Sequence, residues 1–128
     1  MTRHIESHLQ QVCVKWFKLV YKDIAPLLFA VPNASKRGTA TSRRAKAEGL
    51  TEGVSDLILL VPSKDCHGLC IEMKMQTYTY ENGKEHIHKT YQEPCQKKWQ
   101  ALVQAQGYRY EIVRTFDEFK QLIEQYLQ

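Results

Sequence analysis

Three charged residues beside two short apolar runs could form a metal site. Asp56 precedes the apolar residues 57–61, while Glu72 and Lys74 follow a second apolar run, residues 69–71. Glu72 and Lys74 are two positions apart, so in a strand they lie on the same face. Carboxylate oxygens are ligands that Mg²⁺ and Mn²⁺ prefer, and a neighbouring cation can orient water or stabilise charge on a phosphate. The pattern predicts a divalent-metal site.

An ordinary ion pair between Glu72 and Lys74 on a solvated sheet surface is the alternative, because Glu-x-Lys triplets are common. We favour the metal site because charged groups next to apolar strands are costly to bury unless they are paired or bound to a metal. The preceding Gly-Val-Ser-Asp, which ends at Asp56, adds the second carboxylate.

The elements that must position these residues begin with a hairpin. The two apolar runs have the length of strands, and a polar connection containing Gly68 separates them, which predicts an antiparallel pair in the core. Before them, apolar side chains recur at helical spacing and predict a core-packed helix over residues 2 to about 24; they are Ile5, Leu9, Val12, Cys13, Trp16 and Val20, with Phe17 and Leu19 widening the stripe. Glu6 lies beside this stripe, where the pattern alone favours a solvated role.

The apolar residues between Pro26 and Pro32 form either a short strand or an extended connection. Further along, Asn82-Gly83 favours a type I′ turn and predicts an exposed hairpin with Glu81 opposite Lys84 and Tyr78 opposite Ile87. Its tyrosines could stack on bases, although cross-strand packing is their more common role.

The last third of the chain predicts a helix, a strand and a helix. Pro94 suits the first position of a helix that ends before Gly107 and buries Trp99, Leu102 and Val103. A strand follows over residues 108–114. Thr115 and Glu118 form a capping box for a final helix that packs on the core.

The region between Asp23 and Glu48 contains no acidic residue, and its cations are Lys36, Arg37, Arg43, Arg44 and Lys46. Thr41 or Ser42 could cap a short helix there that ends at Gly49. Lys/Arg residues among small and hydroxyl side chains favour contact with nucleic-acid phosphates; a mobile surface loop is the alternative. Lys97 lies in the first turn of a helix, where a cation is unfavourable unless an anion binds.

The composition is that of a soluble globular protein. The chain has 128 residues, 43% hydrophobic and 25% charged, with a net charge of +4, so we expect a single domain over residues 1–128. It has no apolar run of membrane-spanning length and no signal-peptide core, which predicts a cytoplasmic protein. A zinc site at Cys66, His67 and Cys70 is disfavoured because no second Cys/His pair has suitable spacing; reduced thiols are expected.

Taken in order, these motifs resemble the VRR-NUC nucleases of the PD-(D/E)XK restriction-endonuclease-like superfamily. The resemblance covers nearly the whole chain. It rests on the ordered set Glu6, Pro32-Asn33 with Arg37, Gly53-Val-Ser-Asp56-Leu, Ile71-Glu72-Met-Lys74, Pro94-Cys-Gln96 with Trp99, and Gly107-Tyr108.

The resemblance implies an α/β fold with a central mixed sheet flanked by helices, and a metal-dependent DNA endonuclease. Asp56 and Glu72 would bind Mg²⁺ or Mn²⁺ with the main-chain oxygen of Met73, and Lys74 would position the attacking water. The resemblance also makes Glu6 an outer ligand and Gln96 an active-site member. The nucleic-acid contacts it implies are Asn33, Lys36, Arg37, Arg43, Arg44, Lys46 and Lys97.

The implied substrate is DNA, branched as in a four-way junction, cut by a homodimer, and the implied source is a phage or mobile element. Ser55 departs from the proline usual in the family, Ala34-Ser35 from Gly-Gly, and the hairpin over residues 76–91 is longer than usual. The alternatives are a catalytically silent nucleic-acid-binding module with the same fold, and an interaction protein whose basic segment contacts an acidic partner.

Overall fold

A mixed four-stranded sheet is the centre of the molecule. The structure, a computed structural model, describes residues 2–32 and 40–128, the first three of these by their backbone alone. The strands β1 (Leu28–Ala30), β2 (Leu57–Leu59), β3 (Leu69–Met73) and β6 (Arg109–Val113) lie in the order β1-β2-β3-β6. β1, β2 and β3 are antiparallel, whereas β6 runs parallel to β3. The predicted α/β fold and central hairpin are confirmed.

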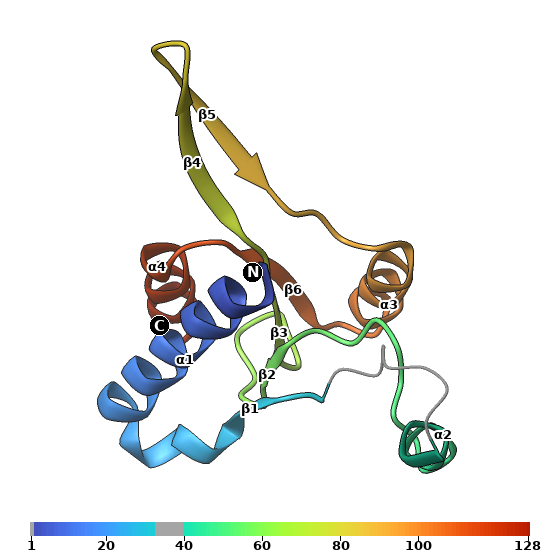
Figure 1. Cartoon of the computed structure of the whole chain (residues 1–128). Helices are drawn as coiled ribbons and strands as arrows, with labels where there is room; N and C mark the ends of the chain where they lie inside the picture. The colour runs from blue at the N-terminus through green and yellow to red at the C-terminus, as the bar shows by residue number, and fades with distance from the viewer. Residues whose placement is uncertain (1, 33–39) are drawn as a thin grey trace.

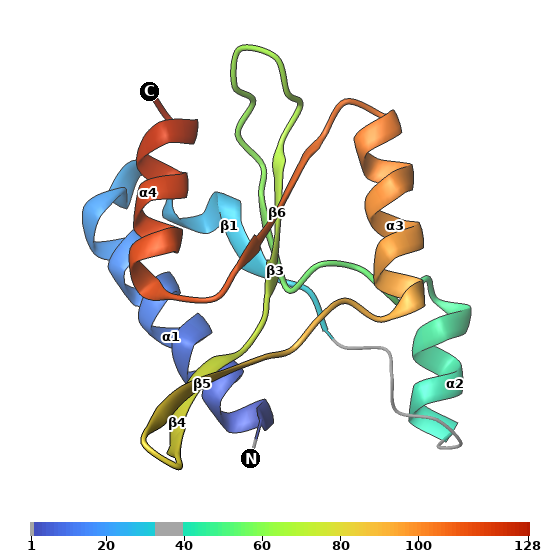
Figure 2. The ribbon, with the colours of Figure 1, turned by 90° about the horizontal axis from the view of Figure 1, so that it is seen from above.

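Helices cover both faces of this sheet (Figures 1 and 2). α1 (Thr2–Val20) and α4 (Phe116–Tyr126) lie on one face, and α3 (Pro94–Ala105) lies on the other. A 3₁₀ helix, η1 (Lys22–Leu27), connects α1 to β1, and α2 (Ala40–Ala47) precedes β2 on the side of α3. The parallel pairing of β3 with β6 requires a crossover, which α3 supplies.

The hydrophobic core lies between the sheet and the pair α1 and α4. β3 is buried on both faces, and its alternate residues Leu69, Ile71 and Met73 point into this core. The opposite alternation sends Glu72 toward α3. Each large apolar side chain that is fully buried contributes about 1.5–3 kcal/mol; the helical members are Cys13, Phe17, Phe119, Leu122, Ile123 and Tyr126.

The predicted first helix is too long and its buried stripe too wide. α1 ends at Val20, and η1 contains Pro26, whose fixed φ and missing N–H suit a short 3₁₀ segment better than a continued α-helix. Leu19 is 62% exposed, and Ile5, Val12 and Val20 are also exposed, because the four short strands contact only a narrow side of α1.

Two further predictions are corrected at the helices α2 and α3. Leu102 is 67% exposed, and α3 has no fully buried residue, so it lies on the sheet by its first turn and by partly buried Trp99 and Val103. α2 begins at Ala40, which places Thr41 and Ser42 inside the helix rather than at its cap. Between Pro26 and Pro32, the residues Leu28–Ala30 form the strand β1, which is the first of the two predicted alternatives.

The second hairpin, β4 (Gln76–Glu81) and β5 (Lys84–Lys89), has the predicted register. Asn82 and Gly83 adopt φ of 52° and 75°, as a type I′ turn requires. The hairpin projects from the body of the molecule (Figure 1), and both of its strands are exposed over most of their length. We call it the arm.

Thr115 caps α4 by accepting a hydrogen bond from the N–H of Glu118, as predicted, while the Glu118 carboxylate accepts from the N–H of Arg114. Among the described helices, none combines the length and the hydropathy that a membrane crossing requires.

Candidate active site

Asp56 is fixed at the entrance to β2 by two backbone contacts. Its main-chain oxygen accepts a hydrogen bond from the N–H of Val31 at 2.9 Å, which continues the pairing of β1 with β2. Its carboxylate oxygen Oδ2 accepts from the N–H of Met73 at 2.7 Å. The register of β2 with β3, in which Leu57 faces Ile71, therefore brings Asp56 opposite Glu72.

Glu72 is buried in the central strand, with 2% of its surface exposed. Its Oε2 accepts a hydrogen bond from Gln96 Nε2 at 3.3 Å, and its Oε1 accepts one from the Tyr110 hydroxyl at 3.3 Å. Lys74 Nζ lies 3.9 Å from Oε2. Side chains from α3 and β6 therefore donate hydrogen bonds to this carboxylate, and Lys74, which directly follows β3, forms an ion pair with it.

Lys74 is directed at the same point by the first turn of α3. Its ammonium donates to Gln96 Oε1 at 2.9 Å, and only 7% of the residue is exposed. Gln96 Oε1 also accepts from the N–H of Glu93 at 2.8 Å, as part of a capping box at the start of α3. The solvated ion pair is therefore the wrong interpretation of Glu72 and Lys74, because both residues are buried.

The start of α3 is held against the entrance to β2 by a close backbone contact at Gly53. Gly53 has φ of +86°, and a Cβ there would lie 2.3 Å from the carbonyl oxygen of Cys95. A side chain at this position would push Gln96 away from Lys74 and Glu72. Two residues later, Ser55 is fully buried and its hydroxyl donates to the carbonyl of Leu57, so serine is accommodated here.

Burial and the neighbouring Asp56 carboxylate raise the pKa of Glu72 to about 9, and the Lys74 ammonium offsets this only in part. Two adjacent carboxylates are unfavourable without a cation, so one of them retains a proton. A divalent cation fits these donors, since Asp56, Glu72 and the main-chain oxygen of Met73 offer the hard oxygens that Mg²⁺ and Mn²⁺ prefer. The described residues contain no group of three or more His, Cys, Asp or Glu side chains placed to hold a metal.

Glu6 lies near this centre without joining the carboxylate pair. Its Oε2 accepts a hydrogen bond from the Thr90 hydroxyl at 3.0 Å, and the Thr90 hydroxyl accepts from the N–H of Met75 at 2.8 Å. Glu6 and Lys74 both line a hollow of about 310 Å³. We call it the α1 hollow.

The predicted nucleic-acid contacts are only partly described. Arg43 and Arg44 are exposed on α2, and Lys46 pairs with Glu52 at 3.0 Å. Lys97 is exposed in the first turn of α3, next to Gln96. Three predicted contacts lie outside the described residues: Asn33, Lys36 and Arg37.

Sequence reasoning missed Tyr110 and Gln92. The Tyr110 hydroxyl donates to Glu72 and accepts from Gln92 Nε2 at 3.1 Å, and its ring lies near Trp99. Burial and the nearby Glu72 raise the pKa of Tyr110, which keeps the hydroxyl protonated as a donor. Alternation within residues 108–114 placed Tyr110 on one face of a strand, but the pairing of that strand with β3 carried no sequence signal.

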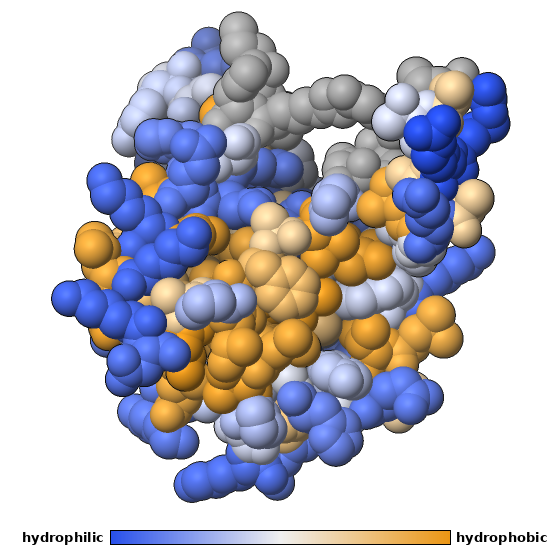
Figure 3. All heavy atoms as spheres, turned by 90° about the horizontal axis from the view of Figure 1, so that it is seen from below, coloured by the Kyte–Doolittle hydropathy of each residue, from blue (hydrophilic) through white to orange (hydrophobic). Residues whose placement is uncertain are grey.

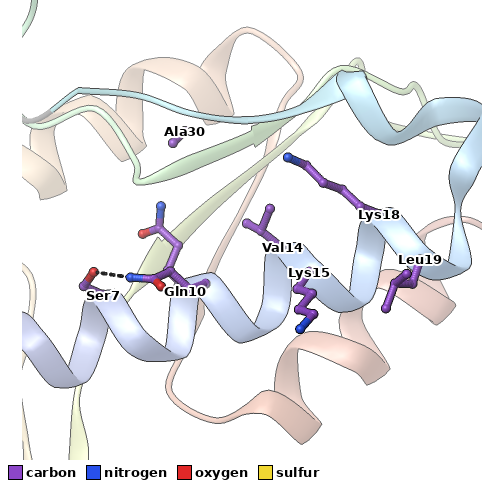
Figure 4. Close-up of a pocket in the computed structure, with 8 residues that line it drawn as sticks. Ser7, Gln10, Val14, Lys15, Lys18, Leu19 and Ala30 are labelled. Atoms are coloured by element: carbon purple, nitrogen blue, oxygen red, sulfur yellow. Dashed lines mark hydrogen bonds between the residues drawn. The ribbon is translucent and has the colours of Figure 1, made fainter.

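A larger hollow, of about 590 Å³, lies between α1 and β1, and none of the predicted site residues lines it. Figure 4 shows Val14 and Lys18 pointing from α1 toward the strand of Ala30, whereas Lys15 points away. Gln11 donates to the Ser7 hydroxyl at 3.1 Å beside it. Because none of the predicted site residues lines this hollow, we assign it no role in their chemistry.

No protein-family model matches the chain, and no curated protein matches it in sequence. Among solved structures, one described as a VRR_NUC domain protein superposes with a TM-score of 0.74 at 23% sequence identity, covering 99% of this chain and 88% of that one. The chain has the VRR-NUC fold. Its mixed sheet flanked by helices is the restriction-endonuclease-like architecture.

Proposed function

We propose that the protein is a metal-dependent DNA endonuclease that hydrolyses phosphodiester bonds. One observation carries the proposal: Asp56 and Glu72 lie side by side in a buried site that also directs the Lys74 ammonium at Glu72. A protein that only binds DNA gains nothing from carboxylates facing phosphates. The VRR-NUC fold supports the same interpretation, because nucleases with folds of this type usually use divalent metals.

Bound at Asp56 and Glu72, Mg²⁺ or Mn²⁺ would supply an activated water and neutralise charge on the leaving oxygen. The protein's own groups would act around that centre. Asp56, fixed by the N–H of Met73, keeps its carboxylate at the strand end, and Lys74 orients the attacking water and offsets charge on the phosphate. Gln96 fixes the Lys74 ammonium in position.

We infer that the attack on phosphorus is in line and leaves a 5′-phosphate and a 3′-hydroxyl. Arg43, Arg44 and Lys97 are exposed on α2 and α3, on the side of the sheet that Glu72 faces, and would contact the DNA backbone. We also propose branched DNA as the preferred substrate, as the resemblance of the sequence motifs to VRR-NUC nucleases implies.

We also propose that two copies act together as a homodimer. Figure 3 shows apolar side chains gathered on the underside of the molecule, where η1 and β1 lie in Figure 1. The exposed apolar residues of these elements and their neighbours are Leu19, Val20, Leu27, Phe29 and Leu60. An exposed apolar surface of this kind favours a protein partner, and a second copy provides the same surface in return.

Cleavage of labelled four-way junction, flap, single-stranded and linear duplex DNA in Mn²⁺, Mg²⁺ or EDTA tests the proposal. Wild type should cut in either metal and not in EDTA. Asp56→Ala and Lys74→Ala should each lower the rate by at least about 100-fold. Lys120→Ala, an exposed lysine on α4, is the matched control and should cut at the wild-type rate.

DNA binding without cleavage in any metal would replace the nuclease with a catalytically silent binding module. Absence of DNA binding at low salt would leave an interaction protein. Equal cleavage by Lys74→Ala and wild type would remove Lys74 from the site.

A further inference from the structure

The α1 hollow combines an apolar wall with a charged edge beside the candidate active site. Half of its lining residues are apolar, namely Ile5, Leu9, Val12, Met75 and Phe116. Ile5 and Val12 are 45% and 40% exposed, so the wall is open to solvent. Its volume of about 310 Å³ is at the lower end of the ~300–1,000 Å³ of small-molecule sites, which are typically apolar with a few polar groups.

Charged groups stand at the edge of the α1 hollow. Lys74 connects it to the carboxylate pair, and Glu6, His8 and Arg114 also line it. Arg114 donates to the carbonyl of Thr90 at 2.8 Å and lies over the ring of Tyr91, which holds its guanidinium in place. Its Nε is buried and has no hydrogen-bond partner within the described part of the chain.

This combination selects the chemistry of the occupant. A free phosphate would leave the apolar wall unused, and a purely apolar ligand would leave the buried Nε of Arg114 without the partner that it lacks within the described part of the chain. A nucleobase has two apolar faces and a polar edge, and it is attached to a chain of phosphates that Lys74 and Arg114 could contact.

We propose that the α1 hollow binds an unpaired nucleobase of the DNA strand, next to the nucleotide whose phosphate reaches Lys74. The proposal rests on the nuclease function proposed above and specifies its substrate: DNA with an unpaired nucleotide at the cleavage site. A base-paired nucleotide must first be unstacked and unpaired to enter, whereas an unpaired one enters at smaller cost. Selectivity for DNA structure then follows from the hollow itself, without contact to base edges in a groove.

The test compares two tryptophan substitutions, one on α1 and one on α3. Val12→Trp fills the hollow, and Leu102→Trp is the matched control, because Leu102 is 67% exposed on α3 and lines neither the hollow nor the proposed dimer surface. Ile5→Trp is a second filling variant, used in the event that Val12→Trp fails to keep the wild-type melting temperature. Binding is measured with Ca²⁺ in place of Mg²⁺, and in EDTA, on duplexes that contain either one unpaired 2-aminopurine or none.

With wild type and Leu102→Trp, 2-aminopurine emission should rise as the base leaves the DNA stack. Val12→Trp should abolish the rise and weaken binding to the DNA with the unpaired base about tenfold, or about 1.4 kcal/mol. Its affinity for the fully paired duplex should not change. Equal emission and affinity for Val12→Trp and wild type would overturn the proposal.

Cleavage of the same DNA in Mn²⁺ separates this proposal from the nuclease function. Cleavage by wild type without any rise in emission would overturn the nucleobase site and leave the nuclease standing. A rise that Val12→Trp abolishes, without cleavage, would support the site and overturn the nuclease. No binding to either DNA would overturn both.

Discussion

The ionisation of Glu72 depends on whether a cation is bound between Glu72 and Asp56. It is buried in the central strand of the sheet, and burial together with the Asp56 carboxylate raises its pKa to about 9. Without a cation, the folded protein therefore favours the protonated carboxyl at neutral pH. A bound divalent cation reverses that preference, so metal binding must release a proton.

The free energy of unfolding should depend on pH because of this proton. The folded state holds it up to about pH 9, while the unfolded chain releases it near the ordinary value of 4.5, so the folded state binds more protons in between. In EDTA, wild type should lose stability relative to Glu72→Gln as pH rises from about 5 to about 9, measured by urea unfolding. Added Mn²⁺ should remove the difference in slope. Parallel pH profiles of the two proteins in EDTA would contradict the raised pKa.

The affinity for metal should depend on the same proton at Glu72. Below pH 9, each decrease of one pH unit should lower the Mn²⁺ affinity, measured by calorimetry, about tenfold, because the metal competes with one proton at Glu72. Glu72→Gln should bind Mn²⁺ weakly at every pH. A pH-independent affinity in wild type would mean that Glu72 is not a ligand.

Tyr110 should affect both Mn²⁺ affinity and stability through its hydrogen bond to Glu72 Oε1. Tyr110→Phe keeps the ring that packs near Trp99 and removes the hydroxyl, so we expect Mn²⁺ affinity to fall about tenfold. The cost in stability should be about 1 kcal/mol. Tyr108→Phe is the control. Tyr108 lies two residues before Tyr110 and is 36% exposed, so its substitution should leave both the Mn²⁺ affinity and the stability unchanged. Equal Mn²⁺ binding by Tyr110→Phe and wild type would show that the hydroxyl does not position Glu72.

The elements that bring the site together meet at α3. This helix begins at Pro94, and Gln96, the N3 residue of its capping box, contacts Lys74, Glu72 and the N–H of Glu93. Because α3 has no fully buried residue, its position depends on this first turn and on the contact at Gly53. The site is therefore sensitive to backbone changes that leave the carboxylates untouched.

Two glycine substitutions should separate the α3 contact from the arm. Gly53→Ala places a Cβ 2.3 Å from the carbonyl oxygen of Cys95, which should cost about 2–4 kcal/mol of stability and lower the Mn²⁺ affinity. Gly83→Ala has a similar φ, +75°, but meets nothing within 4 Å, so we expect a loss of about 1 kcal/mol confined to the arm. Thermal unfolding and Mn²⁺ titration measure both effects. Wild-type Mn²⁺ affinity in Gly53→Ala would contradict the role of this contact.

At the scale of the whole molecule, the apolar underside is a surface that the described elements leave exposed. It follows from the size of the sheet: four short strands bury one side of α1 and leave Leu19 62% exposed. The proposed homodimer would cover this surface and place two catalytic sites on one branched DNA.

Sedimentation of three charge variants tests the dimer. Leu19→Glu and Phe29→Glu each place a carboxylate on the underside, and should convert a dimer to a monomer at micromolar concentration. Leu102→Glu, at a residue 67% exposed on α3, is the matched control and should remain dimeric. A dimer that persists in Leu19→Glu and Phe29→Glu would place the interface elsewhere, and a monomeric wild type would overturn the homodimer.

The sequence by itself determined features that depend on neighbours along the chain. The type I′ turn at Asn82 and Gly83, the Pro94 start of α3 and the Thr115 cap arise from local backbone chemistry, and all three are confirmed. The alternation of β3 also placed Glu72 and Lys74 on one face. These patterns were predictable because residues at most a few positions apart fix them.

Only the tertiary structure decided which side chains surround Glu72. The parallel register of β3 with β6 brings Tyr110 to its carboxylate, and the close approach at Gly53 brings in Gln96 and, through it, Lys74. Apolar spacing alone predicted that Leu19 and Leu102 would be buried, whereas the limited area of the sheet leaves them exposed. Burial and strand register depend on how much surface distant elements offer one another, and that is a property of the folded chain rather than of any segment of it.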